Sequence, residues 1–128
     1  MLEHTFKVVE WSHGKLVLLD QTLLPDQEKY KSYSEVGSIV DAIQRLVVRG
    51  APAIGVAGAF GVVVAMDQAQ RLGLGEEGLH ALIEAIRSAR PTAVNLAWAV
   101  ERVWTFVPQG RDAVLGEALR IAKEDRES

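Results

Sequence analysis

The chain has 128 residues, no cysteine and a net charge of −3, and 48% of its residues are hydrophobic. This length suits one domain with a single core, and the interspersed charges give little support for nucleic-acid binding. The absence of cysteine excludes disulfides and fits a cytoplasmic protein.

The first quarter of the chain predicts a small β-sheet. Thr5–Trp11 and Lys15–Asp20 have the apolar patterning of strands, and Ser12-His13-Gly14 between them supplies a glycine for a tight turn. We therefore expect a β-hairpin. Glu28–Tyr33 is a candidate third strand at the edge of the sheet, because an aromatic residue between two lysines suits a half-exposed position.

Two helices are predicted next. Ser34 is a suitable N-cap for a helix over Glu35–Val48, whose apolar residues recur at helical spacing. The following helix, from Pro52 to about Leu72, is almost wholly apolar over most of its length, so we expect it to be buried on most sides. Its apolar stretch is short for a membrane span, and we expect no membrane location.

Three glycines recur every three residues within this apolar helix, at Gly55, Gly58 and Gly61. Each weakens a helix by about 1 kcal/mol relative to alanine, so their presence needs a compensating reason. Small residues let two helix backbones approach closely. We interpret these glycines as packing contacts with a second helix.

Three more helices are predicted to follow. The first covers Glu76–Ala89. The second starts at Arg90-Pro91 and runs to about Val107, and the third runs from Arg111 to about Asp125. Trp98 and Trp104 are expected to anchor the second of these helices in the core. The fold class is therefore α+β, with a small antiparallel β-sheet in residues 1–33 and a bundle of about five helices in residues 34–128.

Two arginines stand just before prolines that suit the start of a helix. Arg49-Gly50-Ala51-Pro52 precedes the apolar helix, and Arg90-Pro91 precedes the helix that contains Asn95. A guanidinium beside the open N–H groups of a helix start is a good phosphate ligand, and two converging starts would frame one phosphorylated molecule. On the pattern alone, the commoner role of such arginines is to cap a neighbouring helix or to pair with an acid.

Three stretches in order along the chain resemble the methylthioribose-1-phosphate isomerase family. They are Leu18–Pro25 (LLDQTLLP), Arg49–Gly61 (RGAPAIGVAGAFG) and Arg90–Leu96 (RPTAVNL). The family is related to ribose-1,5-bisphosphate isomerases and to the regulatory subunits of eukaryotic initiation factor 2B. Three ordered motifs are a specific signal. The resemblance runs along nearly the whole chain but covers only the N-terminal domain of the family.

The resemblance implies an aldose–ketose isomerase that converts 5-methylthioribose 1-phosphate to 5-methylthioribulose 1-phosphate in methionine salvage. It implies substrate contacts from Arg49, Gly50, Ala51 and Arg90, and neither a metal nor another cofactor. The catalytic cysteine and aspartate of the family belong to a larger C-terminal α/β domain that this sequence lacks. We therefore expect a substrate-gripping domain with no catalytic residue of its own and no turnover when it is alone.

Two other roles stay open. The chain is also compatible with a regulatory or assembly module like the initiation factor 2B subunits, which would bind a phosphorylated ligand without catalysis. A third reading is an oligomerisation domain, because apolar surface left without its partner domain usually drives association. A homo-oligomer is expected on that ground.

Overall fold

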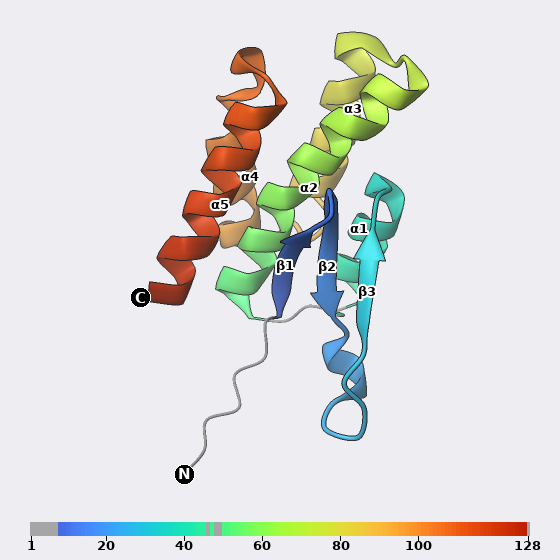
Figure 1. The fold of residues 1–128 in the computed structure, drawn as a ribbon, viewed down its shortest axis with the longest axis vertical. Coiled ribbons are helices and arrows are strands. Elements are labelled where there is room, and N and C mark those ends of the chain that lie inside the picture. The colour runs from blue at the N-terminus through green and yellow to red at the C-terminus, as the bar shows by residue number, and fades with distance from the viewer. Residues whose placement is uncertain (1–7, 46, 48–49, 128) are drawn as a thin grey trace.

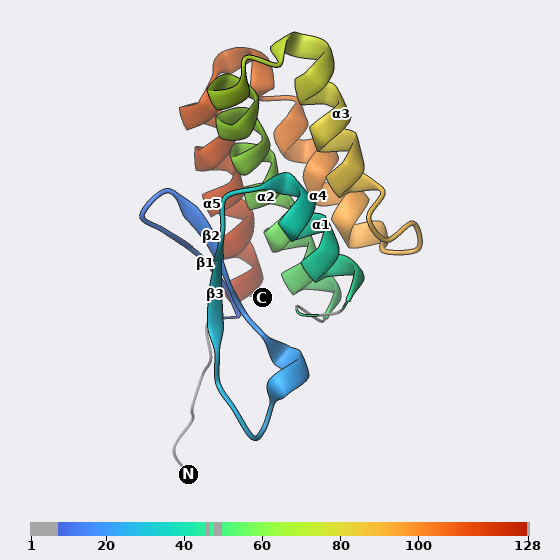
Figure 2. The same ribbon diagram turned by 90° about the vertical axis from the view of Figure 1, so that its right-hand side faces the viewer.

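The computed structural model describes residues 8–45, 47 and 50–127, and within them it contains three strands and five α-helices. The strands form one antiparallel sheet, and the helices lie on one of its faces with α2 in the middle of the bundle (Figure 1 and Figure 2). The predicted α+β architecture is confirmed. The elements are β1 (Val9–Ser12), β2 (Lys15–Leu19), β3 (Tyr30–Tyr33), α1 (Val36–Gln44), α2 (Ala51–Leu72), α3 (Gly75–Arg87), α4 (Val94–Trp104) and α5 (Arg111–Glu127), with short 3-10 turns at Gln21–Leu23 and Val107–Gln109.

The sheet contains the predicted hairpin. β1 and β2 pair antiparallel, and His13 and Gly14 form the turn between them with φ angles of 54° and 75°. A two-residue hairpin turn of this kind needs positive φ at both positions. β3 pairs antiparallel with the other side of β2, so the candidate third strand is confirmed at the edge of the sheet.

Helix α2 is the centre of the fold and contacts the other four helices as well as β1 and β2. It is long and apolar enough to cross a membrane, but 67% of its apolar window is buried inside the protein, as expected of a core helix. Phe60, in the middle of α2, is 1% exposed and stacks on Trp11 of β1 with 5.5 Å between the ring centroids. The helix ends at Gly73, whose φ of 64° is left-handed, as the sequence predicts.

The three glycines of α2 lie where neighbouring helices come closest. A Cβ on Gly55 would lie 3.0 Å from the carbonyl oxygen of Asn95 in α4, and one on Gly58 would lie 2.5 Å from the side chain of Leu96. A Cβ on Gly61 would lie 3.1 Å from the side chain of Ile86 in α3. These distances confirm the packing role, because α3 and α4 occupy the space that side chains on α2 would need.

The start of α1 differs from the prediction. Its N-cap is Glu35 rather than Ser34, and the helix ends at Gln44 rather than Val48. The cap residue makes no side-chain hydrogen bond to the helix. Instead, the Val36 N–H donates to the side-chain oxygen of Gln68 in α2 at 2.7 Å. A residue from a distant helix therefore caps α1, which local sequence rules do not consider.

Gln68→Ala is expected to lower the free energy of unfolding by about 1 kcal/mol, the usual cost of a lost helix cap. The variant leaves the N–H group of the buried Val36 without its acceptor. Gln70→Ala, two residues later on the same helix at an exposed position, is the matched control and is expected to change stability little. Urea unfolding followed by circular dichroism measures both, and equal midpoints for the two variants would contradict the capping role.

Helix α4 also begins later than predicted. It starts at Val94, because residues 90–93 form a turn closed by a hydrogen bond from the Ala93 N–H to the Arg90 carbonyl. Its buried stripe is Leu96, Ala99, Val100 and Val103. Trp104 packs partly against the core, but Trp98 is 54% exposed, so its predicted anchoring role is wrong. A helix rich in apolar residues on several sides does not reveal which face is inward.

Candidate functional site

Helices α2 and α4 run side by side in the same direction. Gly55 of α2 lies against Asn95 and Ala99 of α4, and Gly58, one turn later, lies against Leu96 and Val100. Because the contacts advance together along both helices, their N-termini lie at the same end of the bundle (Figure 2). The last turns of α5 reach this end as well.

The first turn of α2 is open to a small anion. Gly50 is the N-cap with a φ of 94°, and a glycine cap offers no side chain to the helix. The first turn carries no acidic residue, and Ala51 and Pro52 are exposed. The first N–H groups of a helix have no partner within it and carry partial positive charge. Within the described residues, this helix start thus combines N–H groups that have no acceptor inside the helix with small, exposed side chains.

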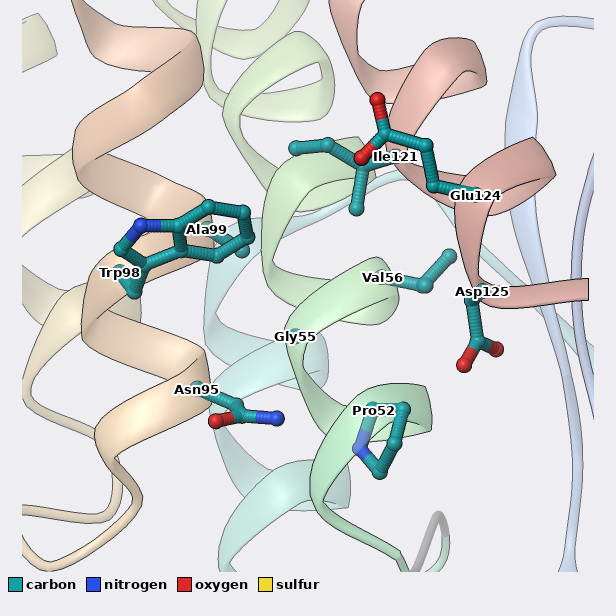
Figure 3. A pocket seen from close by; sticks show the side chains of 9 residues that line it. All are labelled: Pro52, Gly55, Val56, Asn95, Trp98, Ala99, Ile121, Glu124 and Asp125. Atoms are coloured by element: carbon teal, nitrogen blue, oxygen red, sulfur yellow. The ribbon is translucent and has the colours of Figure 1, made fainter. Parts of the chain in front are cut away.

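A cavity of about 210 Å³ lies between α2, α4 and α5 beside this helix start. Figure 3 shows Asn95 and Trp98 reaching from α4 towards α2, with side chains of α5 on the opposite side. The lining residues are Pro52, Gly55, Val56, Asn95, Trp98, Ala99, Ile121, Glu124 and Asp125. The walls are mostly apolar, and polar groups stand at the amide of Asn95 and at the two carboxylates of α5.

An ion-pair network fixes the wall that α4 and α5 share. Arg102 donates from Nε to Glu117 at 2.5 Å and from its two terminal nitrogens to both oxygens of Glu124 at 2.9 Å. Burial raises the pKa of Glu117, but hydrogen bonds from Arg102 and Arg120 outweigh it, so this pKa lies below its usual value. The hydrogen bond from Arg102 also lowers the pKa of Glu124. Both carboxylates are therefore ionised and neutralised near pH 7.

The same arginine holds the exposed indole of Trp98. The guanidinium carbon of Arg102 lies 5.4 Å from the centroid of the Trp98 ring, within the range of a cation–π contact. Trp98 is thus held in place although about half of it faces solvent. The cavity has one rigid aromatic wall.

The four residues predicted to contact substrate lie at different places relative to the cavity. Gly50 and Ala51 form the start of α2, next to Pro52 in the cavity lining. Arg90 is half-buried in the turn before α4 and is not part of that lining. Arg49 lies outside the described residues. The fold thus brings the two helix starts to one end of the bundle, and the contacts of all four residues with a ligand stay predictions.

Sequence patterns did not point to the indole wall or to the contribution of α5. Trp98 was expected in the core, and Ile121, Glu124 and Asp125 lie far along the chain from the motifs. The carboxylate of Asp20 accepts a hydrogen bond from the Thr22 N–H at 3.0 Å and so stabilises the turn that follows β2. Among the described residues, no group of three acidic or histidine side chains is arranged to hold a metal ion.

Comparisons with known proteins agree on one family. The sequence profile of the Initiation factor 2 subunit family matches residues 47–127. A relative from Nocardia farcinica, described as a probable bifunctional methylthioribose-1-phosphate isomerase/methylthioribulose-1-phosphate dehydratase, is 47% identical over 116 residues. That alignment covers 90% of this chain but only 21% of the relative.

Two solved structures share the fold. The 5-methylthioribose 1-phosphate isomerase of Pyrococcus horikoshii superposes with a TM-score of 0.80 at 32% identity, over 91% of this chain and 36% of that one. The delta subunit of initiation factor eIF-2B from A. fulgidus superposes with a TM-score of 0.83 at 33% identity, over 96% of this chain and 38% of that one. The chain therefore spans less than two-fifths of each of these proteins.

Proposed function

The chain belongs to the Initiation factor 2 subunit family, and on that premise we propose that it is the phosphate-gripping domain of an isomerase acting on 5-methylthioribose 1-phosphate. The phosphate binds at the first turn of α2, where Gly50 and Ala51 offer main-chain N–H donors. The observation that carries this proposal is the parallel arrangement of α2 and α4, which brings two positive helix ends to one end of the bundle. The choice of a sugar 1-phosphate as the ligand is supported by the sequence similarity to methylthioribose-1-phosphate isomerases.

The state of Arg90 supports a role in binding the phosphate. In the described part of the chain, the other arginines with described side chains each pair with an acid; they are Arg45, Arg71, Arg87, Arg102, Arg111 and Arg120. The Arg90 guanidinium has no hydrogen bond or ion pair with any described residue, although the residue is half-buried. An arginine of this kind is available for bidentate binding of a phosphate.

The proposed reaction divides the work between two domains. The sugar ring must open, and hydrogen must then move from C2 to C1 to give the ketose. This requires proton-transfer groups and a site that excludes water. This domain holds the phosphate and forms one wall, while the proton-transfer groups come from the second domain of the family. We therefore expect no turnover by the 128-residue chain alone.

Arg90→Ala is expected to weaken binding of 5-methylthioribose 1-phosphate by about tenfold or more, because a hydrogen bond to a charged group contributes about 1.5–3 kcal/mol. Isothermal titration calorimetry on the 128-residue chain measures the affinity. Arg45→Ala removes the same charge from the exposed surface of α1 and is the control. Arg90→Lys keeps the charge but loses the planar fork, so its affinity is expected to fall between the other two.

Equal affinities for Arg90→Ala and Arg45→Ala would contradict a role for Arg90 in binding. If the unmodified chain does not bind 5-methylthioribose 1-phosphate, the proposed phosphate-binding role is wrong. That result would favour the alternative, a regulatory or assembly module, for which the similarity to the eIF-2B delta subunit speaks.

A further inference from the structure

The outer edge of β3 carries unpaired main-chain groups. β3 is the last strand of the sheet and pairs with β2, and in the described part of the chain no strand pairs with its other side (Figure 1). The Asp20 N–H donates to the opposing Lys29 carbonyl at 2.8 Å, so this pair is hydrogen-bonded. Hydrogen-bonded pairs alternate along an antiparallel ladder, so the N–H and C=O groups of Tyr30 and Ser32 point away from β2. Such an edge is a template for one more strand.

A polar groove runs beside this edge, between β3 and α1. Lys31 lies opposite the core residue Leu18, so its side chain is on the face of the sheet that the helices cover. α1 packs on that face next to β3 (Figure 2). The groove between them has a volume of about 600 Å³ and is lined by Lys31, by serine hydroxyls and by charged side chains of α1 and its caps. Every second side chain of a strand added to β3 would therefore point into this groove.

The uncompensated charge at this edge is positive. Lys29 and Lys31, two positions apart on the same face of the strand, are exposed and form no ion pair with any described residue. Each of the two carboxylates of the groove already pairs with an arginine. These ion pairs are Glu35 with Arg71 at 2.7 Å and Asp41 with Arg45 at 2.9 Å. Opposite charges that face each other across a ladder stabilise strand pairing, so a strand with acidic side chains suits this edge.

We propose that β3 binds an extended acidic peptide of another protein as a fourth, antiparallel strand of the sheet. The outward groups of Tyr30 and Ser32 supply the main-chain hydrogen bonds, and Lys29 and Lys31 select acidic side chains at alternate positions of the peptide. No residue that lines this groove also lines the cavity between α2, α4 and α5. The interaction is therefore independent of phosphate binding at the start of α2.

The test titrates the unmodified 128-residue chain with a blocked seven-residue peptide in which glutamate and threonine alternate. A peptide of alternating lysine and threonine is the charge control. The glutamate peptide is expected to bind about tenfold more tightly at low salt, because two exposed ion pairs replace two repulsions, and the difference is expected to shrink at high salt. In NMR spectra the amide signals of Tyr30 and Ser32 are expected to shift, whereas that of Ala51 is expected to stay in place.

Two changes separate strand addition from simple charge attraction. The glutamate peptide methylated on its pairing amide nitrogens keeps its charges and is expected not to bind. Ser32→Pro is also expected to abolish binding but to leave the sheet folded, because the N–H that it removes points outwards and edge strands accommodate such a proline. Ser32→Thr keeps the N–H, is the matched control, and is expected to bind as the unmodified chain does.

Lys31→Glu is expected to reverse the preference in favour of the lysine peptide. Lys15→Glu makes the same change of charge at an exposed position of β2 and is expected to keep the preference for glutamate. Equal binding of the two peptides, equal binding of the methylated and unmethylated forms, or no binding by either peptide would overturn the proposal. If the free chain dimerises in sedimentation experiments and Ser32→Pro makes it monomeric, a second copy occupies the edge and the acidic peptide is wrong.

Discussion

Gly58→Val is expected to lower the free energy of unfolding by about 3 kcal/mol or more, because overfilling a packed core forces its neighbours apart. Even a Cβ at this position would lie 2.5 Å from Leu96 and 3.1 Å from Val100, both of which are fully buried. A valine therefore displaces the buried Leu96 and Val100 side chains or pushes α2 and α4 apart. A natural domain has about 5–15 kcal/mol of stability, so this is a large share. Urea unfolding followed by circular dichroism measures the loss.

Gly116→Val is the matched control for this experiment. Gly116 is also inside a helix, α5, but a Cβ there meets nothing within 4 Å. Valine has a somewhat better helix propensity than glycine, so stability is expected to stay within about 0.5 kcal/mol of the unmodified chain. Similar losses for the two variants would mean that helix propensity, rather than the close approach of α2 and α4, governs the effect at Gly58.

Arg102→Leu is expected to lower the free energy of unfolding by about 3 kcal/mol, because removing one partner of a buried ion pair is strongly destabilising. The side chain of Glu117 is only 8% exposed and would keep Arg120 as its remaining partner. Arg87→Leu is the control, since Arg87 also joins two helices but pairs with a half-exposed Glu101. Exposed pairs contribute about 0–1 kcal/mol. Equal losses in thermal or urea unfolding would contradict the importance of burial at Glu117.

The same network predicts a pH dependence. Because the pKa of Glu117 in the folded chain lies below 4.5, its ordinary value, ionised Glu117 contributes stability that is present above about pH 4.5. This contribution is lost as the pH falls through the lowered pKa. The cost of Arg102→Leu should therefore shrink in acid, where Glu117 becomes protonated and no longer needs the arginine. A cost that stays constant as the pH is lowered stepwise from 7 into the acid range would contradict this assignment.

Local signals in the sequence predicted most of the fold. The bounds of α2 followed from a proline in its first turn and a glycine at its end, and the hairpin followed from the turn residue Gly14. These features act through neighbouring residues and need no knowledge of the tertiary structure. The motif resemblance likewise directed attention to the start of α2.

Features that depend on distant parts of the chain were missed. Gln68 caps α1 from 32 residues away, and Glu117 is buried only because α4 supplies Arg102. Trp98 has a core-like side chain, but it lies beside the contact that Leu96 and Ala99 make with the glycines of α2, and 54% of it is exposed. The cavity needed the end of α5, which no motif touches. Such contacts depend on how the helices pack, and the spacing of residues within one helix does not predict that packing.

The start of α2 has a consequence for how natural variation there should be understood. In the proposed phosphate site, Gly50, Ala51 and Ala53 present main-chain amides, and their small side chains contribute chiefly by leaving room. Alanine scanning would therefore not measure this contribution, because Ala51 and Ala53 are already alanine and alanine at Gly50 would strain the backbone, whose φ is 94°. Selection at these positions would instead act against bulk, against negative charge and against any further proline that removes an amide donor.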